Sequence, residues 1–208
     1  MGVSRSLASP LVIHRGLQGV ILGVVGAGLL MANVSVVVNA VLGLGATALP
    51  TLVRRDLGVH LDPRLTLWVS TAVALHALGM AVLYDLVPWW DHLTHLLSGA
   101  LVAGVAYVAI RTVEEHVEGV TVPATFRGVV IVAFTLVVGV AWEVIEHVGR
   151  DLAIAYGMEP ILQVYGPRDT ALDLIFDGLG GLIVAVAGGR YFEGTVRALR
   201  DRFGSGEA

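Results

Sequence analysis

The sequence contains no cysteine and no lysine, and it has few charged residues of any kind. The absence of cysteine excludes disulfides, thiolate metal ligands and cysteine nucleophiles. Charged residues make up 14% of the 208 residues, whereas a typical soluble domain carries about 25%. No basic run is present, so we expect no nucleic-acid partner. Hydrophobic residues make up 56% of the chain and occur in blocks of membrane-spanning length, which excludes a soluble domain.

We predict an all-α fold, a polytopic transmembrane helical bundle of about six spans that forms a single domain. No segment alternates apolar and polar residues as a membrane barrel strand must. Residues 16–53 form one apolar run that is too long for a single crossing of a core of about 30 Å, and we divide it between Asn33 and Ser35. The predicted spans are residues 17–32, 35–53, 65–84, 91–110, 127–148 and 169–188, and residues 191–203 form an amphipathic helix.

The arginines predict the orientation of these spans. Six spans place eleven arginines on one side of the membrane and two, Arg150 and Arg168, on the other. Cytoplasmic loops carry an excess of positive residues. We therefore predict that both termini are cytoplasmic, that the protein lies in the plasma membrane in contact with lipids, and that the amphipathic helix rests on the cytoplasmic surface.

Ionisable residues gather at the ends of the spans that this orientation turns outward. A charged carboxylate facing lipid costs at least about 2.5–3.5 kcal/mol, so we expect these side chains to turn inward and to find partners. Within each helix they are three or four residues apart and therefore share a face. The candidate cluster consists of Asp91, His95, Glu143, Glu146, His147, Asp173 and Asp177.

Carboxylates this close to one another cannot all stay ionised unaided. Three solutions are open: bound cations neutralise them, some are protonated, or Arg150 and Arg168 fold over them. We interpret Asp169 as the cap of its helix and His92 as an interfacial residue.

Three separated motifs occur in a fixed order along the chain: Asp91-x-x-x-His95 with Ser98-Gly99, Trp142-Glu143-Val144-Ile145-Glu146, and Asp169-Thr170-x-x-Asp173-x-x-x-Asp177-x-x-Gly180. In this order and spacing, the sequence over about residues 80–185 resembles the YjdF-like family of predicted inner-membrane proteins. His147 and Asp177 depart from the pattern of that family. The resemblance implies the fold and the membrane location, and it implies no particular activity.

The leading hypothesis is a metal site within the membrane near the outer face. Oxygen-rich ligands with one or two histidines suit Zn, Mn, Fe or Mg. If the site is catalytic, the metal activates water against a lipid-like or periplasmic substrate, as in a hydrolase. The alternatives are a cation- or proton-coupled transporter and a structural or accessory membrane protein. The expected direct ligands are His95, Glu143, Asp173 and Asp177, with Asp91, Glu146 and His147 behind them.

The predicted topology can be tested with reporter fusions. A reporter fused after Ala208 should give a cytoplasmic readout, and a reporter inserted after Trp90 should give an external one, because these positions lie on opposite sides of the six-span arrangement. The same readout at both positions would contradict the topology.

Overall fold

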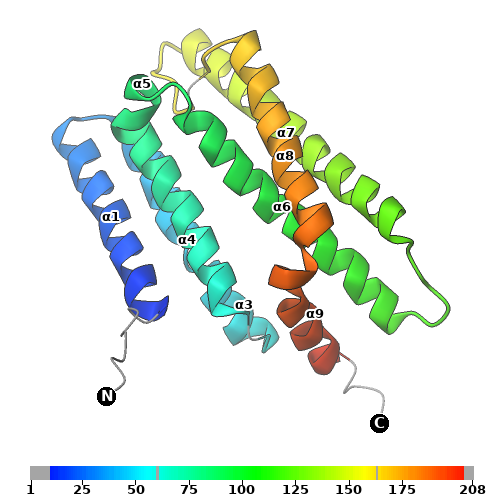
Figure 1. Ribbon diagram of the computed structural model, residues 1–208. Coiled ribbons are helices and arrows are strands. Elements are labelled where there is room, and N and C mark those ends of the chain that lie inside the picture. Colours follow the sequence, from blue (N-terminus) through cyan, green and yellow to red (C-terminus); the bar gives the residue numbers. More distant parts are fainter. Residues whose placement is uncertain (1–9, 60, 163, 204–208) are drawn as a thin grey trace, which may run out of the picture.

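A computed structural model describes residues 10–59, 61–162 and 164–203, and every regular element in these residues is helical (Figure 1). A short π-helical turn, η1, connects α4 to α5. The elements are α1 (Pro10–Leu30), α2 (Val34–Ala46), α3 (Leu49–Leu57), α4 (Pro63–Leu78), η1 (Gly79–Leu83), α5 (Tyr84–Leu86), α6 (Trp90–His116), α7 (Ala124–Ala155), α8 (Pro167–Ala187) and α9 (Gly189–Phe203).

Within the described residues, six helical stretches are long and apolar enough to cross a membrane. This confirms the predicted all-α class, and the direction in which the bundle sits in the membrane stays a prediction. Large apolar side chains such as Leu30 and Val186 remain exposed on the outside, as expected where lipid replaces water. The six stretches are Pro10–Leu30, Val34–Asp56, Pro63–Leu86, Trp90–His116, Ala124–Ala155 and Pro167–Ala187.

The long apolar run at the start of the chain is divided by local backbone chemistry. Ala32 has a positive φ of 53°, which ends α1, and the side chain of Asn33 then accepts a hydrogen bond from the amide of Val36 at the start of α2. A second break at Thr47 and Ala48 precedes α3, which has Pro50 in its first turn. The first helix begins at Pro10, earlier than the predicted start near residue 17.

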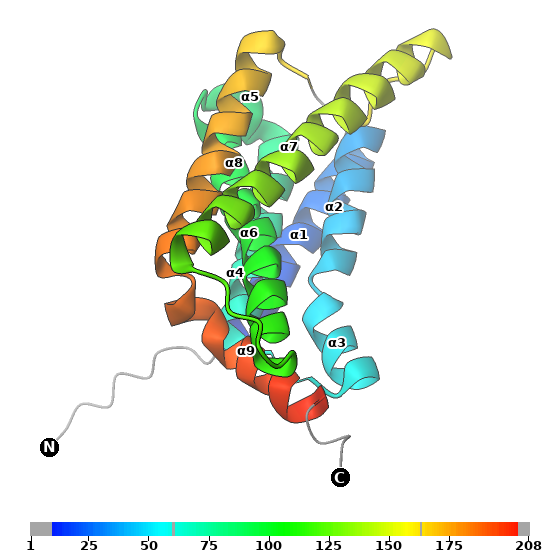
Figure 2. The same cartoon turned by 90° about the vertical axis from the view of Figure 1, so that its right-hand side faces the viewer.

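The helices form two packed halves. In the first, α1, α2 and α4 pack together around Ile21 and Ala40. In the second, α6, α7 and α8 pack together around Ala103 and Ile131. Contacts between α4 and α6 join the halves, and Figure 2 shows α2 and the C-terminal part of α7 on the same side of the bundle. Residues of both halves line the cavity described below.

Helices α6 and α8 approach each other more closely than ordinary side chains allow. A Cβ atom on Gly180 would lie 2.6 Å from the backbone nitrogen of Ala100, and one on Gly99 would lie 2.8 Å from the Cα of Asp177. Both glycines are therefore required for this contact. The close approach holds the first half of α8, which carries two acidic residues of the candidate cluster, against the first turns of α6.

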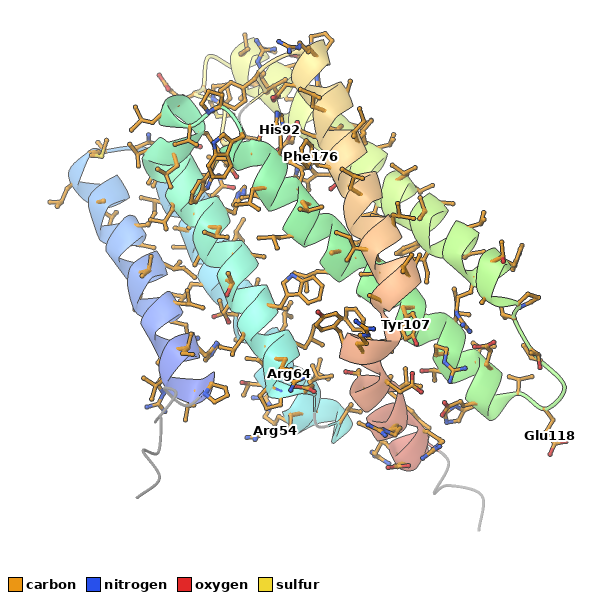
Figure 3. All side chains as sticks on the ribbon, in the orientation of Figure 1. Arg54, Arg64, His92, Tyr107, Glu118 and Phe176 are labelled. Atoms are coloured by element: carbon orange, nitrogen blue, oxygen red, sulfur yellow. The ribbon has the colours of Figure 1, made fainter. Side chains whose placement is uncertain are left out.

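The two ends of the bundle differ in their polar residues. Arg54, Arg64 and Glu118 lie toward one end, and His92 and Phe176 lie toward the other (Figure 3). The first end is the one at which α3 and α9 lie in Figure 1. The ends therefore carry different chemistry: an arginine-rich surface at one and the candidate cluster at the other.

An ion-pair network closes the arginine-rich end. The buried carboxylate of Glu114 accepts hydrogen bonds from Arg111 and Arg127, each at 2.9 Å, and from the amide of Val122 at 2.8 Å. A buried charge is tolerated where partners of opposite sign surround it. These contacts connect the end of α6, the segment that follows it and the start of α7.

Helix α9 packs against the bundle through part of its predicted apolar face. Phe192 and Val196 are buried, and the Phe192 ring lies 5.8 Å from Trp68 and 6.1 Å from Tyr107, measured between centroids. Gly104 makes room for that ring. The amphipathic segment therefore covers the end of the bundle with these side chains, and Phe203 at its end stays exposed.

The α6–α8 contact can be tested with two alanine substitutions on α8. Gly180→Ala should lower the stability by about 1–3 kcal/mol, because its new methyl group meets the backbone of α6. Gly178→Ala is the matched control: its Cβ would lie 3.4 Å from Leu136, an ordinary contact, and the substitution should keep the stability or raise it by up to about 1 kcal/mol, because alanine favours a helix over glycine. Thermal unfolding in detergent measures both, and equal melting temperatures would contradict the close contact.

Candidate functional site

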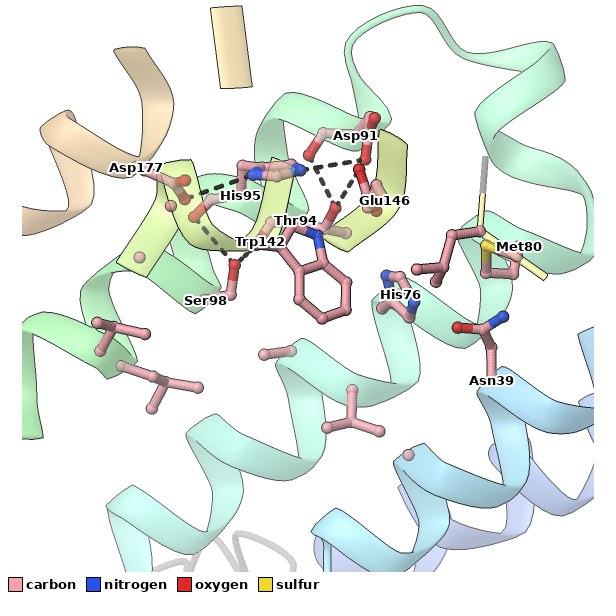
Figure 4. Close-up of a pocket in the computed structure, with 18 of the residues that line it drawn as sticks. Asn39, His76, Met80, Asp91, Thr94, His95, Ser98, Trp142, Glu146 and Asp177 are labelled. Atoms are coloured by element: carbon pink, nitrogen blue, oxygen red, sulfur yellow. Dashed lines mark hydrogen bonds and ion pairs between the residues drawn. The ribbon is translucent and has the colours of Figure 1, made fainter. Parts of the chain in front are cut away.

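His95 lies at the centre of a group of three aspartates. Its Nδ1 is 3.4 Å from Oδ1 of Asp177, and its Nε2 is 3.9 Å from Oδ1 of Asp91 and 4.0 Å from Oδ1 of Asp173. Figure 4 shows His95 between Asp177 on one side and Asp91 on the other. His95, Asp173 and Asp177 are all buried. One imidazole therefore separates three carboxylates that would otherwise repel one another at short range.

Three of these side chains are close enough to share one ion. Ligand atoms of Asp91, His95 and Asp173 all lie within 4.8 Å of one another. Two atoms bound to the same zinc ion lie roughly 3–4 Å apart, given bond lengths of about 2.0–2.2 Å. A small inward movement of side chains would therefore bring the three into bonding distance. Of the predicted direct ligands, His95 and Asp173 belong to this group, together with Asp91, which was expected behind them; Glu143 and Asp177 do not belong to it, and the metal site itself stays a prediction.

His92 belongs to the site, which corrects its interpretation as an interfacial residue. Its Nδ1 lies 3.0 Å from Oδ1 of Asp173, and its ring stacks on Phe176 with 5.1 Å between centroids. His92, Asp169 and Asp173 form a second group whose ligand atoms lie within 4.8 Å of one another. The sequence feature that could have identified His92 is its position three residues before His95, which puts both on one helical face.

Asp169 does not cap α8, contrary to expectation. Gly166 occupies the position before the helix, with a positive φ of 116°, and Pro167 begins the helix. Asp169 lies in the first turn, where a negative charge is favourable beside the free amide groups. Its carboxylate is thus available to His92 and Asp173.

Helix α7 contributes a glycine and a buried glutamate. A Cβ on Gly139 would lie 2.5 Å from Oδ2 of Asp177, so this glycine admits the carboxylate. Helices α7 and α8 pack together in opposite directions. Glu143, one turn beyond Gly139, therefore lies near the level of Asp173, one turn before Asp177. Glu143 is 6% exposed, and its Oε1 is buried with no hydrogen-bond partner among the described residues.

The remaining predicted residues divide between the site and its surroundings. Glu146 lines the cavity described below and lies beside Asp91 in Figure 4. The Nδ1 of His147 donates to the backbone carbonyl of Glu143 at 2.9 Å, which turns the ring toward its own helix rather than into the cluster. Arg150 pairs with Asp151 at 3.3 Å, so it does not neutralise the cluster.

A cavity of about 500 Å³ lies between the two halves of the bundle. Most of its walls come from α2, α4, α6 and α7, with single residues from η1, α5 and α8. Four ionisable members of the cluster face it: Asp91, His95, Glu146 and Asp177. Much of the remaining lining is apolar. A mostly apolar pocket with a few converging polar groups is typical of small-molecule sites.

A chain of hydroxyl groups extends from the cluster along the cavity wall. The Tyr84 hydroxyl lies 2.7 Å from Nδ1 of His76 and 3.2 Å from the Thr94 hydroxyl, which donates to the backbone carbonyl of Asp91 at 2.8 Å. The tyrosine ring fits against Gly79 at the π-helical turn, where a Cβ would lie 2.5 Å from the ring. Such turns often occur at functional sites.

The segment between α7 and α8 covers one end of this cavity. The carbonyl of Ile161 accepts hydrogen bonds from the side chains of Ser35 and Asn39 on α2, the latter at 2.9 Å. Leu162 and Tyr165 of the same segment line the cavity. Burial and nearby acidic groups raise the pKa of Tyr165 to about 12, so its hydroxyl remains a proton donor at neutral pH. We call the described residues of this segment, 156–162 and 164–166, the roof.

Comparison with known proteins supports the family assignment and leaves the activity open. The sequence model of a family described as "Predicted membrane protein (DUF2238)" matches residues 13–194, and the YjdF-like proteins are the same family. No curated protein matches the chain, and no solved structure matches it.

The attachment of the roof can be tested by hydrogen exchange. Replacing Ser35 and Asn39 together with alanine removes two bonds, each worth about 0.5–1.5 kcal/mol, and should speed amide exchange in residues 157–162 roughly tenfold. Ser98→Ala is the control, because the Ser98 hydroxyl bonds only to carbonyls of its own helix among the described contacts. Unchanged exchange in the double variant would show that α2 does not hold the roof.

Proposed function

We propose a specific function for this chain, which belongs to the DUF2238 family of predicted membrane proteins: an intramembrane metalloenzyme of the hydrolase type. In this proposal a divalent cation binds among the buried aspartates and histidines at the roofed end of the bundle. That end faces outward in the predicted topology. The cation activates a water molecule for attack on a substrate in the adjacent cavity.

One observation carries the proposal. Asp91 and His95 of α6 and Asp173 of α8 place their ligand atoms within 4.8 Å of one another inside a membrane-spanning bundle. Carboxylates are costly at such a position unless they have partners, and they are commonly functional where they occur. Even with His92 beside Asp173, two histidines cannot balance the three aspartates around His95, and a divalent cation would supply the missing positive charge.

A second observation supports a ligand at this place. Glu143 has a buried carboxylate oxygen without a partner among the described residues, at the helical level of Asp173. Leaving such a group unsatisfied costs about 1–3 kcal/mol, and more for a charged one. A cation, or a water molecule bound to it, would satisfy this oxygen. The mixed oxygen and imidazole donors suit Zn, Mn, Fe or Mg.

The side chains would then take different roles. Asp91, His95 and Asp173 hold the ion, and His92 orients Asp173 through its 3.0 Å contact. Asp177, whose Oδ1 lies 3.4 Å from Nδ1 of His95, would accept a hydrogen bond from that N–H, which leaves Nε2 free to bind metal. Glu146, on the cavity wall, is placed to accept a proton from an activated water molecule.

The residues that line the cavity favour an enzyme over a transporter. A transport path needs polar groups that continue past the cluster to the opposite side of the bundle. Beyond the chain of hydroxyl groups the cavity lining is mostly apolar, with Leu101 and Val102 of α6 and Ala46 of α2, and the Thr135 hydroxyl there donates to a carbonyl of its own helix. A cluster at one level of the membrane beside a mostly apolar cavity fits chemistry on a bound substrate.

Thermal unfolding separates the metal site from a structural role of the same residues. Chelator should lower the melting temperature of the wild type, and Zn, Mn, Fe or Mg should restore it. At a hundredfold excess of metal over Kd, binding should raise the free energy of unfolding by about 2.7 kcal/mol. Asp173→Asn should abolish this response, because it removes a ligand shared by both groups. Asp151→Asn, on an exposed residue paired with Arg150, should keep it.

Two outcomes would contradict the proposal. If the wild type melts at the same temperature in chelator and in every metal, no ion binds with useful affinity. If Asp173→Asn is destabilised equally in all conditions, the aspartates hold the bundle together by hydrogen bonds alone.

A further inference from the structure

The cavity has the composition of a site for an amphipathic molecule. Its acidic groups and hydroxyls gather toward the roof, and its other walls carry side chains such as Leu101, Val102 and Val138. At about 500 Å³ it is within the range of roughly 300–1,000 Å³ that ligand pockets occupy. A ligand that fills it therefore has one polar end and one apolar chain.

The cavity opens sideways, toward the surface that we expect to contact lipid. Leu42 of α2 and Trp142 of α7 line it, and both remain exposed, at 68% and 39%. Helix α2 packs mainly on α1 and α4, and α7 packs mainly on α6 and α8, so these two helices flank the opening. The roof, bonded to α2 through Asn39, covers the end of the cavity. Entry between α2 and α7 is thus entry from the bilayer.

The charge of the lining selects the polar end of the ligand. Asp91, Glu146 and Asp177 face the cavity, and no arginine lines it among the residues that the structure describes. Even with a divalent cation bound, these carboxylates leave no excess of positive charge to attract a phosphate group. The hydroxyl oxygens of Thr94 and Ser98, whose protons are donated to carbonyls of α6, can accept hydrogen bonds from the hydroxyl groups of an uncharged head group.

We propose that this cavity binds a single-chain lipid with an uncharged, hydroxyl-bearing head group, which enters from the bilayer between α2 and α7. The lipid would be the substrate class of the proposed enzyme, so the inference rests on that function for its biological meaning. Binding itself needs only the cavity and can be measured without metal.

Photolabelling tests the head-group preference. The probe is a monoacylglycerol with a diazirine in its acyl chain, applied to the purified full-length protein in nanodiscs, in chelator and again with added Zn. Unlabelled monoacylglycerol should compete with the probe at a concentration at least roughly tenfold lower than lysophosphatidic acid with the same chain, which corresponds to about 1.4 kcal/mol. Glycerol alone should not compete. Equal competition by the two lipids would overturn the proposal.

A pair of tryptophan substitutions on α6 tests the location. Val102→Trp fills the cavity and should remove most of the labelling, whereas Val105→Trp, on a 63% exposed residue of the same helix, should leave it unchanged. Labelled residues identified by mass spectrometry should lie on α2 and α7 beside the opening. Equal labelling of the two variants would overturn the proposal, and the wild-type competition decides it alone if Val102→Trp does not fold.

The lipid inference and the metal proposal fail in different ways. Absent or non-selective labelling together with metal-dependent melting would refute the lipid site and leave the metal site standing. Selective labelling together with a melting temperature that no metal changes would refute the metalloenzyme proposal and leave a lipid-binding membrane protein.

Discussion

The contact of His95 with three buried aspartates is the interaction on which the rest of the structure depends. In a bundle whose outer surface is apolar, a carboxylate has no water to solvate it and must find its partners inside. Asp91, Asp173 and Asp177 all find the same imidazole, at 3.4–4.0 Å. This shared partner joins α6 to α8, and it concentrates more negative charge than one histidine can balance. The imbalance is the physical reason for expecting a cation.

Three glycines allow the helices to pack closely enough for this contact. Gly99 and Gly180 allow α6 and α8 to approach at backbone distance, and Gly139 lets α7 close over the carboxylate of Asp177. The other half of the bundle contributes no carboxylate to the cluster. It supplies α2 and α4 as walls of the cavity, and Asn39 holds the roof. One half of the bundle thus holds the charges, and the other shapes the space beside them.

The sequence was sufficient for those features that depend on composition and helical spacing. The apolar blocks predicted the all-α class, and four-residue spacing predicted that Asp91 and His95, like Asp173 and Asp177, would share a face. The sequence could not show that His147 turns to the backbone of its own helix, because the four-residue spacing from Glu143 is the same for either orientation of the ring. The cavity and the roof depend on contacts between residues more than a hundred positions apart, such as Asn39 and Ile161, and no local pattern reports them.

The metal content of the purified protein decides whether a cation binds around His95. Elemental analysis should be made on wild type and on His95→Ala, each purified without chelator, incubated with Zn, Mn, Fe or Mg, and then freed of unbound ions. The wild type should retain one of these metals in a near-stoichiometric amount, and His95→Ala, which lacks the central ligand, should retain little. A folded wild type that retains none of the four, or a His95→Ala variant that retains as much as the wild type, would contradict the metal site.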